Sequence, residues 1–182
     1  MIIILEGCDK NGKTTLAHKL SQKLGWPIVK FSAPKNDEDV FKTYMQFILS
    51  RRIPVILDRF YLGEKVYGPI FRGKSQLDYL QSRTLEGLLL TRRSINVYCQ
   101  VPLKEIKKNF IKDKESFANV NQINVIVQSY QKVLKSSLLT WHHYDYTKDP
   151  SMSSIIFTVK NSLKLTRSSR FDSRLAKTRV VR

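Results

Sequence analysis

The chain has 182 residues, with 32 lysines and arginines against 15 aspartates and glutamates, so its formal net charge is +17. This length is enough for one α/β domain with a substantial core. The N-terminal apolar run, residues 2–5, is too short for a signal peptide or a membrane span, and we expect no membrane partner. The positive charge favours anionic partners, either phosphorylated small molecules or nucleic acid. The cysteines, Cys8 and Cys99, fit buried thiols in a reducing compartment better than a disulfide.

A phosphate-binding loop follows the first apolar run. Residues 7–14 match the pattern Gly-x-x-x-x-Gly-Lys-Thr, and a helical pattern comes directly after them. The glycines let successive backbone N–H groups turn toward phosphate oxygens, and the following helix directs its positive end at the same anion. We expect Lys13 to reach the β- and γ-phosphates of ATP and the Thr14 hydroxyl to bind Mg²⁺. The predicted nucleotide-binding residues are Gly7, Asp9, Asn11, Gly12, Lys13, Thr14 and Thr15.

Four further apolar runs alternate with helical patterns along the chain. They cover residues 28–31, 54–57, 95–101 and 141–146. Strands that alternate with helices indicate βαβ units and a parallel sheet. We therefore predict an α/β fold, the three-layer sandwich of P-loop NTPases, with a five-stranded parallel sheet and helices on both faces.

An acid and an arginine end the third of the five predicted strands. In P-loop enzymes an acid at this place holds Mg²⁺ directly or through water, so we predict that Asp58 joins Thr14 at the metal. The neighbouring Arg59 has the planar group that binds a phosphate through two parallel hydrogen bonds. The alternative interpretation of the pair is a surface ion pair.

The region from Asp58 to Gly73 resembles thymidylate kinases, because Asp-Arg-aromatic is followed at a short spacing by a second aromatic residue, Tyr67. The phosphate-binding loop is also similar to theirs, including Glu6 before the first glycine and Asp9 after it. The fuller string resembles the small thymidylate-kinase-like proteins of bacterial viruses. The resemblance covers about the first 75 residues well and the rest only in general layout.

This resemblance implies a kinase that transfers the γ-phosphate of ATP, with Mg²⁺, to dTMP or another nucleoside monophosphate. It implies that Lys13, Arg59, Lys10 and Asp58 are catalytic, with Lys10 at the position of a catalytic arginine. It also places Arg59 on the acceptor phosphate, Tyr67 beside the acceptor nucleoside and Asp9 at its sugar.

The chain between Lys13 and Asp58 is shorter than in typical family members, whose longer segment contributes an arginine and an aromatic residue to base recognition. The base specificity therefore stays open, and the nearest candidates are Phe31, Lys35 and Tyr44.

Two more arginines are candidates for the acceptor. Residues 68–74 are predicted as a glycine-broken basic loop over the acceptor, with Arg72 in it, or as a solvated turn. Arg83, on a predicted helix over residues 77–90, either reaches the acceptor phosphate or stays on the helix surface.

Residues 1–165 are predicted to form the kinase domain, with a short lid near residues 110–117 to which Lys112 and Lys114 contribute. Residues 166–182 form a basic tail, which either binds nucleic acid or an acidic partner or only aids solubility. Thymidylate kinases are commonly dimers, so the resemblance also implies a homodimer. We expect a cytoplasmic protein, in the host cytoplasm if the source is viral.

Three other functions remain as alternatives. A deoxynucleoside kinase would need a carboxylate base near a hydroxyl group, for which Asp9, Glu6 and Glu64 are the candidates. A polynucleotide 5′-kinase would hold a strand on its positive surface. A nucleic-acid-binding module without enzymatic activity would use the tail and keep the fold as a scaffold.

Overall fold

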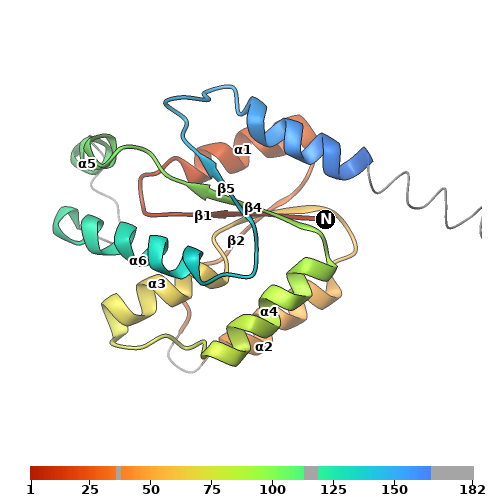
Figure 1. The fold of residues 1–182 in the computed structure, drawn as a ribbon, viewed down its shortest axis with the longest axis horizontal. Helices are drawn as coiled ribbons and strands as arrows, with labels where there is room; N and C mark the ends of the chain where they lie inside the picture. Colours follow the sequence, from red (N-terminus) through yellow and green to blue (C-terminus); the bar gives the residue numbers. More distant parts are fainter. Residues whose placement is uncertain (36–37, 113–118, 165–182) are drawn as a thin grey trace, which may run out of the picture.

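The structure, a computed structural model, describes residues 1–35, 38–112 and 119–164. A parallel sheet of five strands, ordered β2-β3-β1-β4-β5, forms its centre (Figure 1). The strands are β1 (Ile2–Glu6), β2 (Ile28–Lys30), β3 (Val55–Asp58), β4 (Ser94–Cys99) and β5 (Trp141–Tyr144). Every residue of β1 is buried, as expected for the central strand of a sheet that is covered on both faces.

Helices cover the two faces of this sheet unequally. They are α1 (Lys13–Leu24), α2 (Val40–Ser50), α3 (Tyr61–Arg72), α4 (Tyr79–Thr91), α5 (Leu103–Lys112) and α6 (Ile123–Lys135), with a 3₁₀ turn, η1 (Val120–Gln122), before α6. One core cluster joins the sheet to α1 and to a last helix that includes residues 153–164. The other cluster joins the sheet to α2, α3, α4, α5 and α6 (Figure 1). The predicted α/β three-layer fold is therefore confirmed.

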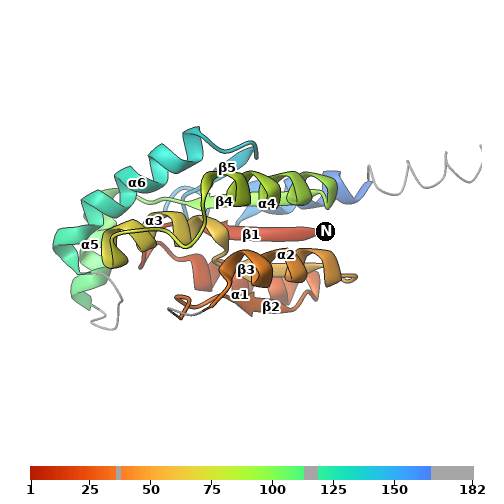
Figure 2. The ribbon, with the colours of Figure 1, turned by 90° about the horizontal axis from the view of Figure 1, so that it is seen from below.

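All five strands run in the same direction, so their carboxyl ends lie along one edge of the sheet. Figure 2 shows β1 running from the N-terminus toward the end of the molecule where α5 lies. The phosphate-binding loop follows β1 at this edge, and Asp58 ends β3 beside it, since Leu5 and Asp58 are partners in the ladder. Ligands of open α/β sheets bind at this edge.

The predicted glycine-broken loop over residues 68–74 is wrong, because α3 continues through Gly68 and Pro69 to Arg72. The glycine serves close packing here and makes no turn. A Cβ atom at Gly68 would lie 2.7 Å from Glu64 Oε1 and 2.9 Å from the Lys74 carbonyl oxygen. A contact of this kind depends on tertiary structure, whereas glycine in a sequence usually indicates a turn.

Cys8 and Cys99 are buried free thiols, as predicted. The predicted lid near residues 110–117 lies mostly outside the described residues, and the basic tail, residues 166–182, lies wholly outside them. In the part of the chain that the structure describes, every helix is too short or too polar to cross a membrane.

The contacts of Gly68 predict a difference between two Gly→Ala variants on neighbouring helices. Gly68→Ala should lower the free energy of unfolding by about 1–3 kcal/mol, because the methyl group meets a carboxylate and a backbone carbonyl. Gly87→Ala, in α4, has open space and should stabilise the protein by about 0.5–1 kcal/mol. Thermal unfolding of both variants measures this, and equal melting temperatures would contradict it.

Candidate active site

The loop after β1 has the backbone of a phosphate cradle. Gly7, Lys10 and Gly12 all have positive φ angles, 141°, 60° and 78°. Gly12 is also the N-cap of α1, and no side chain caps this helix among the described residues. The N–H groups of the first turn are therefore available to an anion, which the helix dipole also favours.

Close packing explains why both glycines are needed. A Cβ atom at Gly7 would lie 2.4 Å from the Cys99 carbonyl oxygen, and one at Gly12 would lie 2.8 Å from the Tyr146 ring. Asn11 fixes the middle of the loop, since its side-chain amide donates to the same Cys99 oxygen at 2.9 Å. The loop is thus held against the ends of β4 and β5 before any ligand contributes.

Lys13 points back over the loop, where its ammonium group donates to the Cys8 carbonyl oxygen at 2.5 Å. The side chain is nearly fully buried. A buried ammonium group needs anionic or carbonyl oxygens around it, and phosphate oxygens in the cradle would supply them.

Thr14 and Asp58 form the pair expected of a magnesium site. The Thr14 hydroxyl donates to Asp58 Oδ2 at 2.7 Å. The other oxygen, Oδ1, is buried and has no partner among the described residues. A buried carboxylate oxygen without a donor fits a cation, and a hydroxyl and a carboxylate are oxygen ligands of the kind that Mg²⁺ prefers. These two residues therefore fit Mg²⁺ between β3 and α1.

Arg59 follows Asp58 at the end of β3, and its side chain binds the phosphate-binding loop. Its guanidinium group forms an ion pair with Asp9 and lies 5.0 Å from the centre of the Tyr67 ring. Tyr67 in turn accepts a hydrogen bond from the Asp9 backbone N–H at 3.2 Å. Burial alone would lower the pKa of Arg59, but the two tyrosines Tyr67 and Tyr130 and the carboxylate of Glu6 raise it, so the side chain stays a cation.

Glu6 holds the turn that presents Arg59. One oxygen of its fully buried carboxylate accepts from the backbone N–H groups of Phe60, at 2.8 Å, and Gly63, at 3.2 Å. The other accepts from the Tyr130 hydroxyl at 3.1 Å. Burial raises the pKa of Glu6, and these hydrogen bonds oppose the shift. Arg59 has a φ angle of 72°, which is unusual for a residue other than glycine, and the Glu6 contacts on the next residues fix this conformation.

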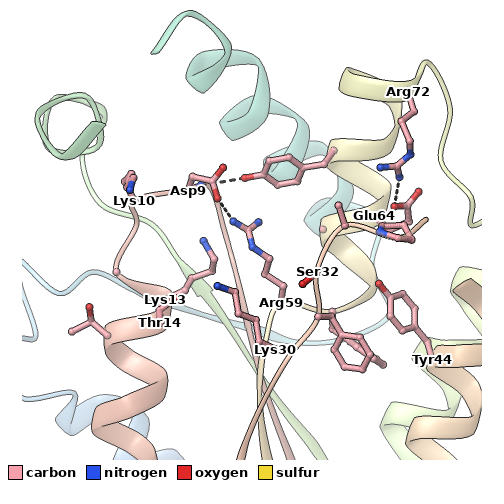
Figure 3. A pocket seen from close by; sticks show the side chains of 18 residues that line it. Asp9, Lys10, Lys13, Thr14, Lys30, Ser32, Tyr44, Arg59, Glu64 and Arg72 are labelled. Atoms are coloured by element: carbon pink, nitrogen blue, oxygen red, sulfur yellow. Dashed lines mark hydrogen bonds and ion pairs between the residues drawn. The ribbon is translucent and has the colours of Figure 1, made fainter. Parts of the chain in front are cut away.

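A cavity of about 540 Å³ joins the phosphate-binding loop to α3. Figure 3 shows Lys10, Lys13 and Thr14 on one side, Glu64 and Arg72 on the other, and Arg59 between them. The far wall is aromatic: its ring residues are Phe31, Tyr44, Phe60 and Tyr67. One end is therefore suited to phosphates and the other to a flat, uncharged ring system.

Glu64 and Arg72 form a second ion pair at the far end of this cavity. Glu64 also accepts from the Gln76 backbone N–H at 2.8 Å. Arg72 keeps a buried Nε–H without a partner among the described residues. The pair thus leaves a hydrogen-bond donor for a ligand at the end away from the loop.

A second cavity, of about 490 Å³, opens on the other side of the loop. Lys10 and Thr15 line both cavities, and Tyr146 and Pro150 bring the chain after β5 to this one. Asn109, on α5, donates to the Lys10 carbonyl oxygen at 3.1 Å and to the Tyr146 hydroxyl at 2.9 Å. A nucleotide whose phosphates lie in the loop could place its base in this cavity.

The structure brings together most of the residues predicted from the sequence, with two exceptions. Lys35 is exposed and lines neither cavity. Arg83 pairs with Glu86 on its own helix at 2.9 Å and lies over the Tyr79 ring, away from both cavities. The structure therefore places neither of them at the candidate site.

The sequence analysis missed one residue that lines the cavity, Lys30, and the structural role of Glu6 beneath the Arg59 turn. Lys30 was overlooked, because a lysine at the end of a short edge strand looks like an ordinary solvated residue. Glu6 was weighed only as a catalytic base, because its backbone partners lie more than 50 positions away, with separations of 54 and 57 residues. The position of Glu6 directly before the phosphate-binding loop was the one sign in the sequence of a role at the site.

The strand order, the loop and the Asp58 site define a P-loop protein with the fold of nucleotide kinases. The chain is 30% identical over 166 residues to the SPbeta prophage-derived uncharacterized protein YorR of Bacillus subtilis (strain 168), a match that covers 87% of this chain and 99% of YorR. It therefore belongs to the YorR family. A comparison with protein-family models finds no match.

Solved structures agree with this assignment. The crystal structure of YorR in complex with phosphorylated GDP has a TM-score of 0.77 and 29% identity, covering 88% of this chain and 96% of YorR. Deoxyadenosine kinase from M. mycoides, with dCMP and a flexible dCDP bound as products, has a TM-score of 0.58 and 19% identity, covering 90% of this chain and 100% of that one. The second likeness concerns the fold alone.

The loop geometry predicts that Gly12→Ala weakens nucleotide binding. The substitution adds a methyl group at a φ angle of 78°, 2.8 Å from the Tyr146 ring, so the loop must shift. We expect the affinity for ADP with Mg²⁺ to fall at least about tenfold in calorimetry. Gly25→Ala is the control, because it has a similar φ angle, 69°, and open space around it. Equal affinities of the two variants would show that the clash at Gly12 is unimportant.

Proposed function

We propose that this protein is an ATP- and Mg²⁺-dependent nucleoside monophosphate kinase. The observation that carries this proposal is the charge of the cavity that joins the loop to α3. Five of its lining residues are positively charged, Lys10, Lys13, Lys30, Arg59 and Arg72, and two are negatively charged, Asp9 and Glu64. A cavity with this excess of positive charge next to a phosphate cradle favours an acceptor that itself carries a phosphate.

The loop and Lys13 would hold the β- and γ-phosphates of ATP, and Thr14 with Asp58 would hold Mg²⁺. Lys10 would neutralise charge on the donor side of the γ-phosphate, because it lines both cavities. A Mg²⁺ ion bound there neutralises charge on the donor phosphates. Arg59 donates one N–H group to Asp9 and can offer others to the acceptor phosphate.

The transfer itself asks little covalent chemistry of the protein. An oxygen of the acceptor phosphate attacks the γ-phosphorus, the bond from that phosphorus to the β–γ bridging oxygen breaks, and ADP leaves. The attacking oxygen is already an anion, so no general base is needed. The protein contributes alignment of the two phosphates and neutralisation of the charge between them.

The acceptor nucleoside would lie against the aromatic wall, with Phe31, Tyr44 and Tyr67 near its rings and Arg72 as a hydrogen-bond donor. Asp9, which keeps one buried oxygen without a partner among the described residues, would accept from the sugar. The bound phosphorylated GDP of the related YorR supports a nucleotide ligand in this family. The resemblance to thymidylate kinases of bacterial viruses makes dTMP the first acceptor to test.

An acceptor panel tests the proposal. ADP release from ATP is measured with the four deoxynucleosides, the corresponding nucleoside monophosphates and 5′-hydroxyl oligonucleotides, with and without EDTA. We expect release with one or more monophosphates, and none after EDTA. Lys13→Ala should lower the rate at least about 100-fold and controls for contaminating kinases. Release with oligonucleotides alone would indicate a polynucleotide kinase, and no release with salt-dependent DNA binding would indicate a binding module.

A deoxynucleoside kinase is the second candidate, because the fold is shared with deoxyadenosine kinase. Such an enzyme must deprotonate a hydroxyl group, and its candidate bases here already have partners. Glu6 accepts three hydrogen bonds, from two backbone N–H groups and Tyr130. Asp9 and Glu64 are each paired with an arginine. These contacts support structural roles for the three acids.

Glu6→Gln tests whether Glu6 is the general base of a deoxynucleoside kinase. An amide oxygen can still accept from Phe60 and Gly63, so a residue that only holds the Arg59 turn should leave the turnover number within about tenfold of the native value. Loss of a general base would lower it about 100- to 10,000-fold and remove an ionisation from the pH–rate profile. Steady-state kinetics across pH, with the acceptor identified by the panel, give the answer.

A further inference from the structure

Lys30 differs from the other cations of the cavity in its partners. Arg59 is paired with Asp9, Arg72 is paired with Glu64, and Lys13 donates to a loop carbonyl group. Within the part of the chain that the structure describes, the Lys30 ammonium group makes no hydrogen bond or ion pair. The cavity thus holds a cation whose charge no neighbouring side chain neutralises.

The register of the sheet places Lys30 beside the magnesium site. Lys30 on β2 and Asp58 on β3 are ladder partners, as are Ile28 and Ile56 two residues earlier. Partners on neighbouring strands point to the same face of a sheet. Ile28 and Ile56 both pack in the cluster that contains α1, so Lys30 and Asp58 also point to the face where α1 begins with Thr14.

Figure 3 agrees with this register, because Lys30 extends from the floor of the cavity between Lys13 and Arg59. The donor phosphates would lie over the end of β1, where the loop is. β2 is the outer strand beyond β3, and Phe31 of the aromatic wall directly follows it. Lys30 therefore approaches the gap between the two phosphates from the acceptor side.

We infer that Lys30 is a binding residue for the phosphate monoester of the acceptor. This inference rests on the proposed function, and it adds a residue to which neither the loop motif nor the Asp58-Arg59 pair points. An ammonium group on a flexible stem can follow the acceptor phosphate from its bound position toward the donor. Lys30 also favours monophosphates over nucleosides, because a neutral hydroxyl acceptor offers its ammonium group no anionic partner.

The test uses Lys30→Met, Lys30→Arg and, as a matched control, Lys42→Met on the exposed surface of α2. Calorimetry measures the dissociation constants of the monophosphate that binds most tightly, of its parent nucleoside and of ADP. The readout is the ratio of the nucleoside constant to the monophosphate constant. This ratio reports how much affinity the phosphate contributes, whatever the base and whether or not turnover occurs.

We expect Lys30→Met to lower this ratio about ten- to 100-fold, Lys30→Arg to restore most of it, and Lys42→Met to leave it unchanged. ADP affinity should stay the same in all three variants. An unchanged ratio in Lys30→Met would overturn the inference, as would an equal loss of ADP affinity, because Lys30 would then serve the donor. A native protein that binds monophosphates as weakly as nucleosides would overturn it as well.

These outcomes are distinct from those of the kinase assay. A native protein that binds a monophosphate through Lys30 but releases no ADP would contradict the proposed kinase and leave the Lys30 site standing. A protein that phosphorylates monophosphates normally after Lys30→Met, with the same KM, would keep the kinase and remove Lys30 from it.

Discussion

The carboxylate of Glu6 joins the strand before the phosphate-binding loop to the turn that presents Arg59. It lies at the end of β1, one residue before the phosphate-binding loop, and binds the backbone of the turn that follows β3. A carboxylate with no exposed surface is costly unless its oxygens have donors, and here Phe60, Gly63 and Tyr130 supply them. Because the same contacts hold Arg59 in a left-handed conformation, the phosphate-binding loop and the Arg59 turn are fixed to each other by one buried group.

The cations of the cavity fall into two groups, those with an acidic partner and those without one. Two arginines are paired with acids, so they are held in defined orientations and still keep donors for a ligand. Two lysines, Lys13 and Lys30, have no acidic partner among the described residues and face the gap where phosphate charge would gather. This division is suited to an enzyme that must position two anions close together, since paired arginines fix geometry and the lysines neutralise the added charge.

The likeness to YorR covers most of this chain and nearly all of YorR, which shows the family. The proposed activity is inferred from the residues of the site. The aromatic wall comes from the segment after β2, from α2 and from the start of α3, and the Glu64–Arg72 pair lies on α3. A helix in place of the predicted loop over residues 68–74 matters here, because it places Glu64 and Arg72, two turns apart, on the same face toward the cavity.

The sequence alone determined the parts that depend on local chemistry. The apolar runs of β1, β3 and β4 indicated a buried parallel sheet, and the spacing from Gly7 to Thr14 indicated a phosphate cradle, because each depends only on neighbouring residues. Tertiary structure decided that α3 is a helix, that Glu6 anchors the Arg59 turn, that Arg83 turns away and that Lys30 enters the cavity. Apart from Arg83, whose partner Glu86 is local, each of these depends on strand order, register or a contact between distant residues, which the sequence around these positions does not fix.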